Sequence, residues 1–163
     1  MEHFTIATVA EESADFRRVL WTGEHTQLVI MTIQPGGEIG EEVHEVDQIL
    51  TFVSGTGEAK ISGSTKQVAQ GDLVVVPAGK KHNFLNTGEN PLILYTVYGP
   101  PEHADGAVHK TKEEADELEE AGKDEPPASP RPAHRSGSRT RWPSSASRRT
   151  SSTASTSSRP TRA

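Results

Sequence analysis

Short runs of alternating or continuous apolar residues recur along residues 1–99, and turn residues separate them. This pattern is typical of an all-β sandwich or barrel, and it disfavours parallel α/β folds because no run in this region is long enough for a core helix. Gly, Pro and Asn in the intervening segments supply the backbone angles that tight turns need. We therefore expect nine strands, at residues 4–9, 18–22, 27–34, 48–53, 58–61, 66–69, 72–76, 82–86 and 92–98.

The pattern changes after Gly99. Thr111 is a suitable helix N-cap, Glu114 three residues later can complete a capping box, and Gly122 is a common helix terminator. The segment between them has few apolar positions. We therefore expect a short acidic helix over residues 111–122 that faces solvent.

The C-terminal segment differs from the rest of the chain in composition. Residues 126–163 contain eight Arg and eleven Ser, but no acidic and no large aliphatic residue. Such a segment cannot bury enough apolar surface to offset the entropy lost on ordering its backbone. We expect a barrel domain at residues 1–110, the helix at 111–122 and a disordered tail at 123–163. The tail is either an RNA-binding segment or, as we favour, an extension without function.

Charge and composition narrow the function classes. Residues 1–125 hold 9 basic and 23 acidic residues, so this part of the chain repels nucleic acid and anionic membranes. There is no cysteine, which excludes disulfides and thiolate metal sites. The sequence contains neither an apolar run of about 18 to 20 residues nor a secretory signal pattern. We expect a cytoplasmic protein with a site for a small molecule.

Two groups of residues carry the candidate chemistry. The first is Gly36, Glu42, His44, Gln48 and Gly55, and the second is Gly71, Pro77, Gly79, His82 and Asn86. Their spacing resembles the two sequence motifs of the cupin superfamily, at residues 36–55 and 71–86. The second motif matches without a substitution, whereas the first has Glu42 and Gln48 where typical cupins have His and Glu. The resemblance implies a single jelly-roll β-barrel in which ligands from neighbouring strands meet at one metal ion.

Glu42 and His44 lie two residues apart, so on an extended segment their side chains point to the same face. By the resemblance, Glu42, His44, Gln48 and His82 are the four metal ligands. Two imidazoles with one carboxylate suit iron, manganese, nickel or zinc as the divalent metal. If Glu42 is not a ligand, it is the best-placed general base, and therefore the candidate catalytic residue.

The chain looks like a small single-domain cupin, of the kind that resembles sugar-phosphate isomerase domains (RmlC-like cupins). This implies metal-dependent action on a small carbonyl or sugar-acid molecule, as an isomerase, lyase or dioxygenase. The alternative is a non-catalytic cupin that binds a small ligand or is purely structural. We expect a homodimer, because the strands at 4–9 and 18–22 would otherwise expose unpaired backbone groups.

Residues outside the motif ligands are assigned to packing or to the surface. We expect core or pocket-wall positions for Leu50, Phe52, Leu73, Val75, Phe84, Leu94 and Tyr95, and Asn86 is expected to fix the backbone near the site. We expect surface positions for the histidines that match no motif, namely His3, His25, His103, His109 and His134.

Overall fold

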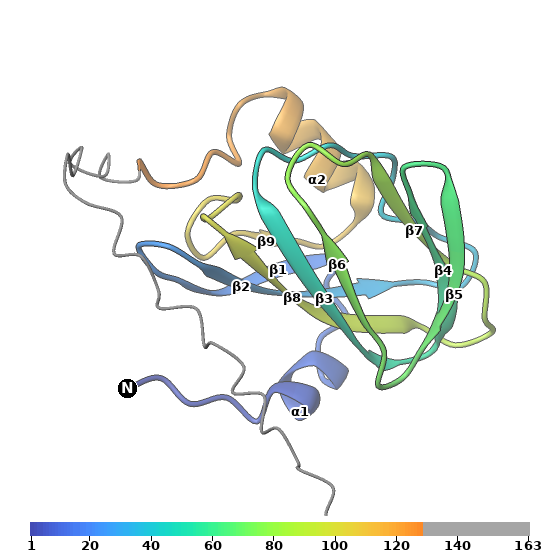
Figure 1. The fold of residues 1–163 in the computed structure, drawn as a ribbon. Helices are drawn as coiled ribbons and strands as arrows, with labels where there is room; N and C mark the ends of the chain where they lie inside the picture. The colour runs from blue at the N-terminus through green and yellow to red at the C-terminus, as the bar shows by residue number, and fades with distance from the viewer. Residues whose placement is uncertain (129–163) are drawn as a thin grey trace, which may run out of the picture. The chain divides into compact units, whose positions relative to one another are not determined.

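The structure, a computed structural model, describes residues 1–128 (Figure 1). The predicted disorder of the tail beyond Ala128 lies outside the described residues. In the described part, no helix is both long and apolar enough to cross a bilayer. The elements are α1 (Ile6–Glu11), β1 (Arg17–Thr22), β2 (Gln27–Ile33), β3 (Asp47–Ser54), β4 (Thr56–Ile61), β5 (Ser64–Ala69), β6 (Leu73–Val76), β7 (His82–Asn86), β8 (Leu92–Gly99), β9 (Val108–His109) and α2 (Lys112–Glu120).

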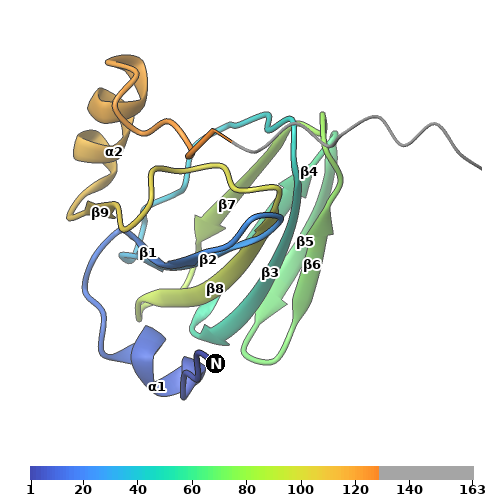
Figure 2. The same ribbon diagram turned by 90° about the vertical axis from the view of Figure 1, so that its left-hand side faces the viewer.

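Two antiparallel sheets face each other and enclose the core (Figure 2). The larger sheet has the order β6-β3-β8-β2-β1-β9 and the smaller has the order β5-β4-β7. Residues 36–44 run alongside β7, and the Ile39 N–H donates to the Phe84 carbonyl at 3.0 Å. The predicted all-β jelly-roll barrel with a short C-terminal helix is therefore confirmed, and eight of the nine predicted strands are present with ends that differ by a few residues.

The core follows from the alternation of the strands. Every second residue of β8 is buried, from Leu92 to Tyr98, and across the barrel the rings of Phe52 and Phe84 lie 5.9 Å apart. The prediction fails on β6, where Leu73 and Val75 are 59% and 54% exposed. β6 ends the larger sheet, so these two side chains point outward from an edge where no other element covers them in the described part of the chain.

The predicted strand at residues 4–9 is wrong, because the chain forms helix α1 there. The β-branched residues of this segment favour a strand locally. Ile6, Val9 and Ala10, however, have the spacing of one helical face, and this face packs on Ile30 and Val53 on the outer side of the larger sheet. Tertiary packing thus overrides the local preference.

Helix α2 begins at the predicted cap, where the Thr111 hydroxyl accepts a hydrogen bond from the Glu114 N–H at 3.2 Å. The helix does not simply face solvent, because Ala115 is fully buried. Beyond Gly122, Asp124 is only 7% exposed and accepts hydrogen bonds from Ala104 N and the His103 ring. Asp124 therefore packs with the barrel, although sequence composition assigned it to the tail.

Two truncations distinguish the segment that contains Asp124 from the tail beyond Ala128. A chain that ends at Ala128 should melt within a few degrees of the full chain, because the tail has no large aliphatic residue to pack. A chain that ends at Gly122 loses the buried Asp124 carboxylate and leaves its donors unpaired, which costs about 1 to 3 kcal/mol. Thermal unfolding followed by circular dichroism measures both. Equal melting temperatures for the two truncations would contradict a structural role for Asp124.

Candidate metal centre

Backbone pairing brings Glu42 and His82 together. The two residues form an isolated antiparallel bridge, with the Glu42 N–H donating to the His82 carbonyl at 2.9 Å and the His82 N–H donating back at 3.0 Å. Residues directly opposite each other in such a pair present their side chains on the same face. The register of this bridge therefore sets the separation of the two side chains, and their nearest N and O atoms are 4.0 Å apart.

His44 lies between two carboxylates. Its Nε2 is 3.0 Å from Glu42 Oε2, and its Nδ1 is 2.8 Å from Glu102 Oε1. The turn before β7 also holds the His44 backbone, because the Gly79 N–H donates to the His44 carbonyl at 2.7 Å. Gly79 has a φ of +75°, a conformation that favours glycine, which explains the glycine of the second motif.

His82 is buried, and one of its ring nitrogens is free. Nδ1 is 2.9 Å from the Lys80 carbonyl, so Nδ1 carries the proton. Nε2 therefore has an unshared electron pair, and it has no hydrogen-bond partner although it is buried. The His82 and His44 rings are 5.2 Å apart, and the ligand atoms of Glu42, His44 and His82 all lie within 4.8 Å of one another.

Gln48 reaches the barrel interior from β3. Its amide nitrogen donates to the Tyr98 hydroxyl at 2.9 Å, while its amide oxygen is buried without a partner. Burial raises the pKa of Tyr98, so the hydroxyl stays protonated. A carbonyl oxygen without a donor is an available hard ligand, and Tyr98 fixes the orientation of the amide that carries it.

The three titratable groups differ in charge. Burial alone would lower the pKa of His44, but the hydrogen bonds to Glu102 and Glu42 outweigh burial and raise this pKa to about 9. Burial lowers the pKa of His82. For Glu42, burial opposes ionisation, yet the His44 hydrogen bond and the Arg17 charge lower its pKa. At neutral pH the site without metal thus holds a protonated His44, a neutral His82 and an ionised Glu42.

Arg17 on β1 connects the site to the C-terminal segment. It is only 1% exposed, and its guanidinium contacts Glu119 of α2, lies 3.5 Å from Glu42 and lies 3.5 Å from Asp124. The alternation of β1 could have indicated that Arg17 is buried. Arg17 and Val19 point inward, whereas Arg18 between them is exposed.

Two histidines assigned to the surface are buried. His103 and His109 are each 2% exposed, and His103 Nδ1 is 2.8 Å from Asp124 Oδ2. The ring of His103 lies 6.5 Å from that of His44 and 5.1 Å from that of Tyr98. No sequence motif marks these positions, because their partners are distant in the chain.

Asn86 also differs from its predicted role. Its side chain donates to the Ile33 and Asn90 carbonyls and accepts from the Gly88 N–H. It does fix backbone, but at the end of β7 opposite to His82, and therefore away from the metal centre.

The residues present fit a divalent metal ion. A neutral imidazole nitrogen, an imidazole paired with a carboxylate and a free amide oxygen are a mixed N/O ligand set typical of iron, manganese, nickel or zinc sites. The non-ligating nitrogens are held by Lys80 O and Glu102, as in metal sites where an outer partner orients each histidine. An ion would replace the proton shared by His44 Nε2 and Glu42 Oε2.

Comparison with known proteins agrees with this architecture. Residues 29–98 match the family model described as "Cupin domain". The uncharacterized protein YrkC of Bacillus subtilis is 41% identical over 68% of the chain, although the chain spans only 63% of YrkC. The uncharacterized protein L612 of Acanthamoeba polyphaga mimivirus is 33% identical, over 63% of the chain and 69% of L612.

A solved structure is similar to this chain in both sequence and fold. BH2720 from Bacillus halodurans is 37% identical and superposes with a TM-score of 0.70, over 71% of this chain and 93% of that one. On the strength of this sequence and structural similarity, the chain belongs to the cupin family, as a small single-domain member.

Proposed function

We propose that the protein binds one divalent metal ion through Glu42, His44, Gln48 and His82, and acts on a small carbonyl or sugar-acid molecule. The observation that carries this proposal is the unpartnered, buried Nε2 of His82 beside Glu42 and His44. A buried polar atom without a partner costs free energy, so its retention calls for a ligand. A bound divalent metal supplies Lewis-acid stabilisation of a developing oxyanion.

Glu42 acts as a ligand in this proposal rather than as the general base. An efficient base has a pKa near the working pH, whereas the surroundings of Glu42 lower its pKa. A carboxylate that stays ionised is a good ligand for a hard cation. Isomerase, lyase and dioxygenase chemistry all remain compatible with this ligand set.

One observation favours a structural cupin as the second candidate. Glu42 already has His44 and Arg17 as charge partners, so its carboxylate is satisfied without an ion. Elemental analysis of the purified full chain by mass spectrometry separates the two candidates. About one ion per chain supports the metal site, and a chain that stays empty after dialysis against Fe²⁺, Mn²⁺, Ni²⁺ and Zn²⁺ contradicts it. Turnover of uronates, sugar phosphates and diketones then separates an enzyme from a binding module.

Metal affinity should increase with pH. His44, with a pKa raised to about 9, must lose its proton before Nε2 can bind an ion. Between pH 6.5 and 9 the apparent affinity should therefore increase roughly tenfold per pH unit and then level off. Without metal, the stabilisation from protonated His44 is complete below pH 6.5 and is lost as pH rises through 9. Titration calorimetry with Zn²⁺ in buffers of different ionisation enthalpy measures the proton release, and an affinity independent of pH contradicts the assignment.

The homodimer expected from the sequence stays a prediction, as does the cytoplasmic location. The sequence argument for the dimer weakens, because residues 4–9 form no edge strand. Strands β3 and β6, however, present exposed apolar side chains that a second copy of the chain could cover. Ile49, Leu73 and Val75 are 41%, 59% and 54% exposed, and Ile49 pairs with Val75 across these strands. Light scattering at micromolar concentration should give twice 17.6 kDa, and Leu73→Lys should halve this mass. A monomeric mass for the unsubstituted chain contradicts the dimer.

A further inference from the structure

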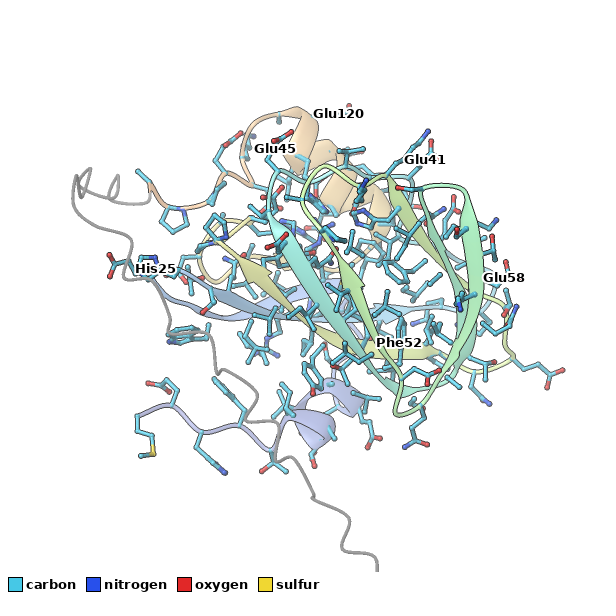
Figure 3. All side chains as sticks on the ribbon, in the orientation of Figure 1. His25, Glu41, Glu45, Phe52, Glu58 and Glu120 are labelled. Atoms are coloured by element: carbon cyan, nitrogen blue, oxygen red, sulfur yellow. The ribbon has the colours of Figure 1, made fainter. Side chains whose placement is uncertain are left out.

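A cavity of about 470 Å³ opens beside the metal centre. It is lined by residues 42–45 before β3, by Glu102 and His103 after β8, and by Glu119 of α2 together with residues 124–126. Figure 3 shows Glu45 at this end of the barrel, whereas Phe52 lies farther down in the core. The volume is in the range of sites for small molecules.

The cavity carries a large excess of negative charge. Six of its ten lining residues are acidic and none is Lys or Arg, the acidic residues being Glu42, Glu45, Glu102, Glu119, Asp124 and Glu125. Arg17, which contacts these carboxylates but does not line the cavity, neutralises one of the six negative charges. A divalent ion at the centre would neutralise two more, so about three negative charges remain. Charges near a ligand in a partly buried cavity act through an effective dielectric constant well below that of water, so they repel an anion and attract a cation. An anionic ligand is therefore strongly disfavoured.

His103 provides a second and independent indication of a ligand. It lines the cavity, is 2% exposed, and has its Nδ1 fixed by Asp124 at 2.8 Å. Because the Asp124 carboxylate accepts from Nδ1–H, Nε2 is left as an acceptor, and Nε2 has no hydrogen-bond partner. Burial lowers the pKa of His103, in keeping with a neutral ring. His103 therefore lacks one hydrogen-bond donor, which no described residue supplies, and it is a residue of the cavity wall.

A second metal ion is a poor explanation of this cluster. The ligand atoms of His103, Glu119 and Asp124 do lie within 4.8 Å of one another. The Arg17 guanidinium, however, already contacts Glu119 and lies 3.5 Å from Asp124, so a cation occupies the space between these carboxylates. Arg17 therefore stands where a metal ion ligated by Glu119 and Asp124 together would have to lie.

We infer that the cavity binds a small molecule that carries a protonated amino group, with this group donating to His103 Nε2 and lying among the carboxylates. This inference rests on the proposed function, in which an oxygen of the same small molecule faces the metal ion. It narrows the substrate class to amino-substituted carbonyl compounds or amino sugars. Of the two classes named in the proposed function it thus keeps the carbonyl compounds, and it disfavours free sugar acids and sugar phosphates, whose negative charge the acidic wall repels.

Three sugars that differ at one carbon test the inference. 6-Amino-6-deoxy-D-glucose, D-glucose and D-glucuronate carry an ammonium, a hydroxyl and a carboxylate on carbon 6. In titration calorimetry with the metal-loaded full chain, the amino sugar should bind at least tenfold more tightly than glucose, and glucuronate should not bind. Raising the NaCl concentration should reduce the preference, because salt screens the carboxylates.

Two variants locate the effect. His103→Leu should weaken binding of the amino sugar about tenfold or more and leave the metal content unchanged. His25→Leu makes the same substitution at a side chain that is 82% exposed, in the turn between β1 and β2, so it should change nothing.

The outcomes are distinguishable from a failure of the proposed function. A chain that binds no metal contradicts the proposed function, and the sugars can then be tested on the apo chain. Glucuronate binding as tightly as the amino sugar, binding of none of the three sugars, or an unchanged affinity in His103→Leu each overturns the inference, whatever the metal content.

Discussion

His82→Ala is expected to abolish stoichiometric metal binding and to leave the β-sheet circular dichroism signal nearly intact. His82 contributes the one buried ring nitrogen at the centre that is neutral and unpartnered, so its loss removes a ligand that no neighbour replaces. His44→Ala should have the same effect, because it removes the second imidazole. Metal analysis after gel filtration should give less than about one tenth of an ion per chain for either variant. Glu102→Gln, which removes only the charge of the acceptor that His44 Nδ1 faces, should weaken affinity by about 10- to 100-fold.

His25→Ala is the matched control for these variants. His25 lies in the exposed turn between β1 and β2, and its side chain is 82% exposed. Its substitution should leave metal content at the level of the unsubstituted chain. Full occupancy in the His82→Ala protein would contradict the proposed ligand set, since the ion would then have to lie elsewhere.

Arg17→Met should lower the free energy of unfolding by about 3 to 5 kcal/mol, which is the usual cost of removing one partner from a buried ion pair. The methionine fills similar space but leaves the buried Asp124 and the largely buried Glu42 without their positive neighbour. Urea unfolding of the metal-free chain, followed by tryptophan fluorescence and circular dichroism, measures this loss. Metal-free conditions matter because a bound ion would partly compensate for the missing charge.

Arg18→Met provides the comparison on the same strand. Arg18 is the neighbouring residue but is exposed, so its substitution should change the free energy of unfolding by no more than about 0.5 kcal/mol. If Arg17→Met and Arg18→Met had the same stability, the contacts of Arg17 with Glu42, Glu119 and Asp124 would make no net contribution.

The sequence predicted the barrel well because its strands are marked twice, by alternation and by turn residues. The glycines at Gly36, Gly55, Gly71 and Gly79 all have positive φ, as their turns require. The error at residues 4–9 has a different origin. Those residues have mixed local preferences, and the deciding factor is the apolar outer face of the larger sheet, which only the assembled fold reveals.

The candidate site was predictable only as far as its residues lie in motifs. Glu42, His44, Gln48 and His82 have fixed spacings along two strands and one adjoining segment, and the prediction that they share one ion awaits its test. Arg17, His103 and Asp124 have no such spacing. Their positions depend on contacts between β1, the segment after β8 and the segment after α2. A local sequence pattern cannot indicate contacts between segments so far apart in the chain.

The pairing of Arg17 with Asp124 spans 107 residues of sequence. During synthesis on a ribosome, Arg17 and Glu42 emerge well before Glu119 and Asp124, so the charge of Arg17 is only partly compensated until α2 and the segment after it have been made. Such long-range contacts slow folding, because the entropy of closing the loop is lost before the contact forms. We therefore expect the contacts of Arg17 with α2 and the segment after it to form late in folding, when nearly the whole domain has left the exit tunnel.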